Sequence, residues 1–113
     1  MIKQYQHEFP HYDNGPAFEQ MLDWLAPLGF KDNSWHNDTC PCIALSRPDG
    51  ERIIELYIEY GNREIRDDPK DLSTYFVLLY DDEGQYTDQS KSFVQAEEAL
   101  AFIKQMYLRD ESL

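Results

Sequence analysis

Two histidines and a glutamate near the start of the chain match the H-E-x-x-H pattern of zinc proteases. These residues are His7, Glu8 and His11. The pattern works because an α-helix places both histidines on one face, where they bind the metal while the glutamate acts as a base. Pro10 lies inside the match, and a proline in a helix interior costs about 3 kcal/mol and removes a hydrogen bond. We therefore interpret the match as accidental.

A second group with metal-binding chemistry consists of His36, Cys40 and Cys42, which His7 or His11 would have to complete. Structural zinc sites usually space their cysteines as C-x(2–4)-C and add a second, distant pair of ligands. Here a single residue separates the two cysteines, and the chain has only 2 of them. We favour two reduced cysteines that act as small apolar residues on a strand. A metal-binding domain or small metal-dependent enzyme is the alternative.

Motifs for nucleophilic catalysis or phosphate binding are missing from the sequence. None of the serines lies in a G-x-S-x-G turn, and the 5 glycines form no phosphate-binding loop. The 22 acidic residues always allow two carboxylates to meet somewhere, so such a pair carries little information. We expect no catalytic residue and no cofactor, and we favour a protein that is not an enzyme.

Net charge is the strongest signal in the composition. The 22 acidic and 10 basic residues give a formal charge of −12. Nucleic acids and anionic membranes are bound through lysine and arginine, so we expect neither as a direct partner. A basic protein surface fits better, such as that of a nucleic-acid-binding protein or a nuclease. No secretory signal or apolar run of about 18 residues is visible, which predicts a cytoplasmic protein.

Two amphipathic helices are predicted, one near each end of the chain. The first begins at Asn14-Gly15-Pro16, since asparagine can cap a helix and proline is tolerated in the first turn. The second begins at Ser92, because Ser92 and Gln95 have the S-x-x-Q spacing of a capping box. Apolar residues then recur at helical spacing as far as Leu28 and Tyr107, respectively.

Between the helices, alternating and apolar segments separated by turn residues predict strands. We therefore expect a single α+β domain over residues 1–113, with an antiparallel sheet of about five strands and both helices packed on one face. Residues 1–12 fit a loosely packed arm or an edge strand, and residues 109–113 fit a polar tail. The predicted strands are residues 30–36, 40–47, 51–60, 72–80 and 85–89.

The segment 51–60 alternates more regularly than any other. Successive side chains of a strand point to opposite faces, so its aliphatic residues should pack against the helices and its acidic residues should face solvent. An antiparallel sheet with helices on one face leaves the other face wet, and charges are expected there with or without a function. The aliphatic set is Ile54, Leu56 and Ile58, and the opposite set is Glu51, Glu55, Tyr57 and Glu59.

We predict that this acidic face and the loop after it bind the partner. A row of carboxylates on a rigid sheet can occupy a basic groove and mimic the phosphates of a nucleic acid. In size and charge the chain is similar to small phage inhibitors, including anti-CRISPR and anti-restriction proteins, and to immunity proteins that neutralise nuclease toxins; no motif assigns it to either group. An accessory domain that forms homo-oligomers through exposed aromatic residues is a third alternative. The predicted partner-binding residues are Glu55, Tyr57, Glu59, Glu64, Asp67 and Asp68.

Overall fold

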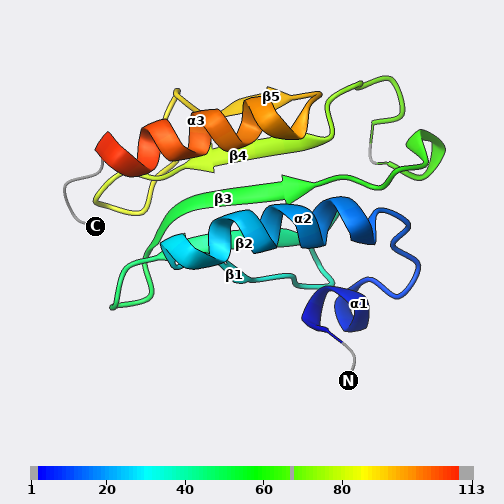
Figure 1. Ribbon diagram of the computed structural model, residues 1–113, viewed down its shortest axis with the longest axis horizontal. Helices are drawn as coiled ribbons and strands as arrows, with labels where there is room; N and C mark the ends of the chain where they lie inside the picture. Colours follow the sequence, from blue (N-terminus) through cyan, green and yellow to red (C-terminus); the bar gives the residue numbers. More distant parts are fainter. Residues whose placement is uncertain (1–2, 67, 110–113) are drawn as a thin grey trace.

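The computed structural model describes residues 3–66 and 68–109. They contain a five-stranded antiparallel sheet in which the strands lie in sequence order, β1-β2-β3-β4-β5 (Figure 1). The predicted α+β class and antiparallel sheet are confirmed. The strands are β1 (Lys31–Asp32), β2 (Cys42–Ser46), β3 (Arg52–Ile58), β4 (Tyr75–Leu79) and β5 (Lys91–Phe93).

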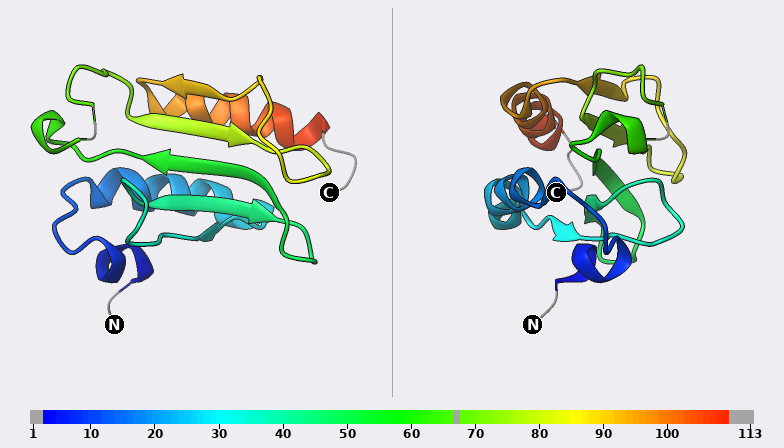
Figure 2. Two further views of the ribbon diagram at one scale, coloured as in Figure 1. Left: turned by 180° about the vertical axis from the view of Figure 1, so that it is seen from behind. Right: turned by 90° about the vertical axis from the view of Figure 1, so that its right-hand side faces the viewer.

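Two long helices cover one face of this sheet, as predicted. They are α2 (Gly15–Leu25) and α3 (Ala96–Arg109), which lie side by side on the same side of the strands (Figures 1 and 2). The short helix α1 (Gln4–Glu8) lies beside the β1 edge, and two 3-10 turns, η1 (Ala26–Leu28) and η2 (Arg63–Ile65), complete the elements. Within the described ranges, no helix has the length and apolar character needed to cross a membrane.

The core lies between β3 and the two long helices. Ile54, Leu56 and Ile58 are buried on this side of β3, as the alternation predicted. Each fully buried aliphatic side chain contributes about 1.5–3 kcal/mol to folding, so this face accounts for much of the stability. The helices supply Phe18, Met21, Leu25, Ala99, Phe102 and Ile103, which belong to the same buried cluster.

The start of α2 agrees with the sequence pattern, but its cap does not. The helix begins at Gly15 with Pro16 in its first turn. The Asn14 side chain makes no capping hydrogen bond; instead its Nδ2 donates to the backbone oxygen of Glu59 at 3.0 Å. Asn14 therefore connects the start of the helix to the end of β3.

The fifth strand differs from the prediction. Residues 85–89 were expected to pair with β4, but β5 occupies that edge instead. Residues 85–89 form no strand, although Tyr86 makes an isolated bridge to Tyr80 and the backbone N–H of Thr87 donates to the oxygen of Leu79 at 2.9 Å. The turn residues after β4 predict where the chain reverses, but they do not fix how far along the chain pairing resumes.

The predicted start of the second helix at Ser92 is also wrong. Ser92 pairs with Phe76 inside the sheet, and α3 begins at Ala96. The S-x-x-Q spacing is a local signal, whereas the backbone groups of the β4 edge need partners and find them in residues 91–93. Gln95 still contributes to the helix, because its backbone oxygen accepts from Ala99 N at 3.2 Å.

Over residues 3–12, the part of the N-terminal segment that the structure describes, the chain is neither an edge strand nor a loose arm. Residues 4–8 form α1, and Tyr5 and Phe9 are buried. Since α1 ends at Glu8, the H-E-x-x-H match does not lie within one helix. Of the predicted polar tail, only Arg109 falls within the described residues.

Candidate functional site

The face of the sheet opposite the helices is not the exposed acidic surface that the alternation predicted. Glu55 and Glu59 have only 1% and 7% of their surface exposed, so their predicted exposure is wrong. Tyr57, between them, is half-buried. The loops that join the strands lie on this side of the sheet, away from α2 and α3 (Figure 2). Alternation therefore gives the face on which these side chains lie, but it does not give their exposure to solvent.

Glu55 belongs to a buried hydrogen-bond network. Its carboxylate accepts a hydrogen bond from the Tyr80 hydroxyl and lies 3.3 Å from the Arg52 guanidinium. The Cys42 thiol lies 4.0 Å from Oε2 of Glu55, the same oxygen that lies near Arg52. A buried carboxylate is tolerated when it is paired and hydrogen-bonded in this way. Burial, and then the hydrogen bond to Glu55, raise the pKa of Tyr80 above its usual range.

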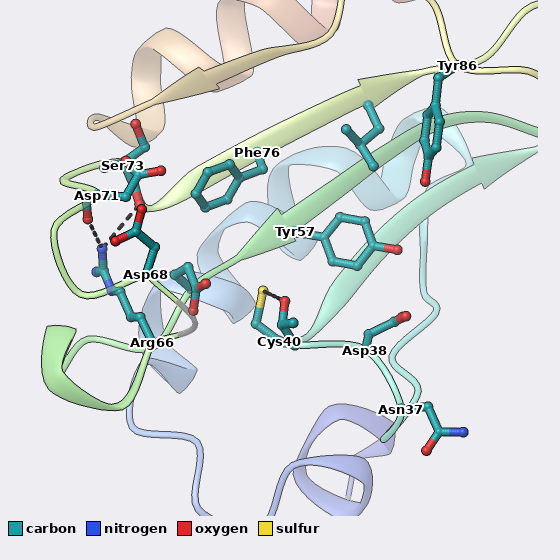
Figure 3. Close-up of a pocket in the computed structure, with 13 residues that line it drawn as sticks. Asn37, Asp38, Cys40, Tyr57, Arg66, Asp68, Asp71, Ser73, Phe76 and Tyr86 are labelled. Carbon is teal, nitrogen blue, oxygen red and sulfur yellow. Dashed lines mark hydrogen bonds between the residues drawn. The ribbon is translucent and has the colours of Figure 1, made fainter.

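A cavity of about 440 Å³ opens on this same face (Figure 3). Its floor is formed by side chains of the two central strands, with Tyr57 on β3 and Phe76 and Leu78 on β4. Tyr57 and Phe76 are directly paired in the sheet, so both side chains lie on the same face. Tyr86 reaches toward the cavity from the loop after β4, and 66% of its surface is exposed. We call this set, Tyr57, Phe76, Leu78 and Tyr86, the cavity floor.

The rim of the cavity is acidic. Asp68 and Asp71 lie at one end near Arg66, and Asp38 lies at the other end near the Tyr57 hydroxyl (Figure 3). Glu59 lines the cavity as well, and its carboxylate accepts from the backbone N–H of Tyr60 at 3.1 Å. We call Asp38, Glu59, Asp68 and Asp71 the acidic rim. Among the described residues that line the cavity, four are acidic and one is basic.

The basic side chain is Arg66, and it donates hydrogen bonds to groups of the protein itself. Its Nε donates to the backbone oxygen of Tyr60 at 2.7 Å, and its Nη1 donates to the oxygens of Ser73 at 3.1 Å and Asp71 at 3.4 Å. Its Nη2 donates to the Thr74 hydroxyl at 3.3 Å. The buried guanidinium therefore ties the loop between β3 and β4 into the wall of the cavity.

The structure separates the predicted partner-binding residues into three groups. Tyr57, Glu59 and Asp68 line the cavity. Glu55 serves the buried network described above, and Glu64 is exposed in η2, outside the cavity lining. Asp67 lies outside the described residues.

Sequence reasoning missed most of the cavity. The missed residues come from four separate parts of the chain, and only those in β4 had a usable signal. Phe76 and Leu78 alternate with the buried Tyr75, Val77 and Leu79, which places them on the other face of the strand. The positions of the remaining missed residues depend on the paths of loops; these residues are Asn37, Asp38, Thr39, Arg66, Asp71, Ser73 and Tyr86.

The residues of the alternative metal site, His36, Cys40 and Cys42, have contacts that do not suit metal binding. Cys40 and Cys42 are free thiols and both are buried. Burial, and then the charge of Glu59, raise the pKa of Cys40 to about 12, which keeps the thiol protonated and a poor metal ligand. The His36 ring is 62% exposed and its Nδ1 lies 2.9 Å from Glu8. In the part of the chain that the structure describes, no three His, Cys, Asp or Glu side chains are grouped so that they could hold a metal ion.

The contact between Glu8 and His36 predicts a specific pH dependence. The hydrogen bond from the His36 ring lowers the pKa of Glu8 below its ordinary 4.5. Because the folded state favours the charged carboxylate, this contact stabilises the fold above about pH 4.5 and is lost as pH falls through the lowered value. We expect Glu8→Gln to lower the melting temperature at about pH 7, and we expect this difference to shrink as pH falls below 4.5. Thermal unfolding of both proteins across this range checks it, and a difference that does not change with pH would contradict it.

Comparisons with protein-family models, with curated proteins and with solved structures find no match for this chain. A function must therefore be assigned from the geometry of the cavity. We call the face of the sheet on which the cavity opens, away from α2 and α3, the open sheet face.

Proposed function

We propose that this chain is a small, non-catalytic binding protein or inhibitor of the cytoplasm that docks its open sheet face on a basic site of a partner protein. The single observation that carries the proposal is the cavity floored by aromatic rings and bordered by the acidic rim, on the sheet face away from the helices. Two buried free thiols fit a reducing compartment.

Charge supports a basic partner. The formal charge is −12, and four acids line the cavity, of which Asp68 is exposed and Asp38 and Asp71 are partly exposed. Asp68 is exposed at the cavity, and Glu64 is exposed in η2 on the same loop, which Arg66 holds in place. Complementary charge raises the rate of encounter and suppresses association with acidic proteins. A site that normally holds a nucleic-acid backbone would offer such a basic surface, and the acids would then occupy the positions of phosphates.

The aromatic residues support a protein interface. Tyrosine and other aromatic residues are enriched at binding sites, since they combine a large apolar area with a polar tip. Tyr86 is exposed for 66% of its surface although it lies at the cavity, and Trp35, at 53%, lies on the neighbouring loop. Binding would bury such side chains and gain apolar stabilisation in addition to the charge attraction.

Affinity capture from the native host, at low and at high salt, is the first test. We expect a partner with a basic surface that is recovered at low salt and lost at high salt. Salt shortens the range of attraction between exposed charges from about 10 Å at 0.1 M to about 3 Å at 1 M. Recovery of an acidic partner, or of one that high salt does not release, would contradict the proposal.

A further inference from the structure

Resting on the proposed function, we infer that the cavity on the open sheet face binds an arginine side chain of the partner. The cavity combines two features that such a side chain needs, an apolar floor for its stem and carboxylates for its head (Figure 3). A volume of about 440 Å³ falls in the range of ligand pockets, which is roughly 300–1,000 Å³.

The cavity floor suits an aliphatic stem that ends in a cation. Phe76 and Leu78 are half-buried, so part of each side chain is covered by the protein and part remains open to the cavity. The rings of Tyr57, Phe76 and Tyr86 surround the same space. A cation within about 6 Å of an aromatic ring face is attracted by the ring electrons, and the attraction grows when water is excluded.

The acidic rim supplies the charge. Asp68 accepts from the backbone N–H of Lys70 at 3.1 Å, and Asp71 accepts from that of Ser73 at 2.8 Å. A carboxylate has about four acceptor sites, so each of these bonds leaves capacity for a further donor. Arg66 already donates to three backbone oxygens and one hydroxyl. A second guanidinium therefore enters a site whose local charge is negative.

Arginine fits this site better than lysine does. Its planar guanidinium stacks on aromatic rings, binds a carboxylate through two parallel hydrogen bonds, and is less strongly hydrated than an ammonium group. The cavity offers aromatic walls along its length and carboxylates at both ends. Lysine also has an aliphatic stem and a cation that aromatic rings attract, but its ammonium group cannot stack or form two parallel hydrogen bonds to one carboxylate, and it loses more hydration on entry.

Titration of the isotope-labelled protein with N-acetyl-arginine amide, followed by nuclear magnetic resonance, tests the inference. We expect saturable shifts for the cavity residues with a dissociation constant in the millimolar range, as is typical of a small fragment.

Two variants test the two halves of the site. Phe76→Leu keeps an apolar floor but removes one ring, and Asp68→Asn keeps the shape but removes one charge. Each should weaken binding by about threefold or more. Tyr86→Leu, at an exposed position, serves if Phe76→Leu does not fold, and Glu98→Gln on α3 is the matched control.

Two further probes decide the chemistry. N-acetyl-norleucine amide and N-acetyl-lysine amide should both bind more weakly than the arginine probe. Equal binding of norleucine would mean that the cavity recognises apolar groups only, and equal binding of lysine would remove the preference for guanidinium; either result overturns the inference. Absence of shifts at the cavity would overturn it as well. The proposed function has its own test, the affinity capture. It fails if the captured partner binds independently of salt and of the surface acids, whatever the result of this titration.

Discussion

Replacing Glu55 by alanine should lower the free energy of unfolding by about 3 kcal/mol. The substitution leaves the Tyr80 hydroxyl without its acceptor, removes the partner of Arg52 and opens a void in a place where 1% of the native side chain is exposed. Urea unfolding followed by tyrosine and tryptophan fluorescence gives the value. Glu55→Lys should be worse, because it places a positive charge beside Arg52 in the same buried position.

Two controls identify the cause of this loss. Glu51→Ala removes an exposed acid just before the same strand and should change the free energy of unfolding by less than about 0.5 kcal/mol. Tyr80→Phe removes only the hydroxyl that donates to Glu55 and should cost about 1 kcal/mol. A Glu55→Ala protein as stable as the Glu51→Ala protein would show that Glu55 is solvated, as the alternation alone predicted.

Arg66→Ala should lower the free energy of unfolding by a similar amount, about 3 kcal/mol. It removes four hydrogen bonds from one buried cation and leaves the oxygens of Tyr60 and Ser73 without their donor. Since Arg66 and Cys40 line the same cavity, the loosened loop should also expose the Cys40 thiol. Urea unfolding measures the first effect, and the rate of modification by a thiol reagent measures the second.

Arg63→Ala is the matched control for this prediction. Arg63 is exposed and donates one hydrogen bond, from Nη2 to the backbone oxygen of Pro69 at 3.2 Å. Arg63→Ala should lower the free energy of unfolding by less than about 0.5 kcal/mol and leave the reactivity of the Cys40 thiol unchanged. Equal losses in both variants would mean that the hydrogen bonds of Arg66 contribute no more than those of a surface side chain.

Local periodicity predicted the parts of the fold that depend on one element at a time. The alternation of residues 51–60 correctly predicted that Ile54, Leu56 and Ile58 face the helices. The helical spacing after Pro16 predicted the buried stripe of α2 for the same reason, since a repeating pattern reports which side of an element is covered. Two apolar stripes and one alternating sheet leave few ways to bury all three, and packing both helices on one face is the simplest.

The candidate site was much less predictable, because loops build most of it. The alternation placed Glu55 and Tyr57 on one face correctly, yet it could not show that Glu55 is buried there among Tyr80, Arg52 and Cys42. Asp38 and Asp68 lie 30 positions apart in the sequence and share the cavity only because of the tertiary fold. Arg66 would have been expected on the surface in so charged a segment, and its burial depends on backbone oxygens that no sequence pattern reports.

The central claim, that the open sheet face is the partner-binding surface, is tested most directly by charge reversal on the two sides of the molecule. Glu64→Lys with Asp68→Lys changes the cavity side, and Asp23→Lys with Glu98→Lys changes the helix side by the same net charge; all four residues are exposed. With the captured partner purified, the first pair should raise its dissociation constant at least about tenfold and reduce its salt dependence, without changing the melting temperature. The second pair should have a much smaller effect. Equal weakening by both pairs, or none by the first, would contradict the claim.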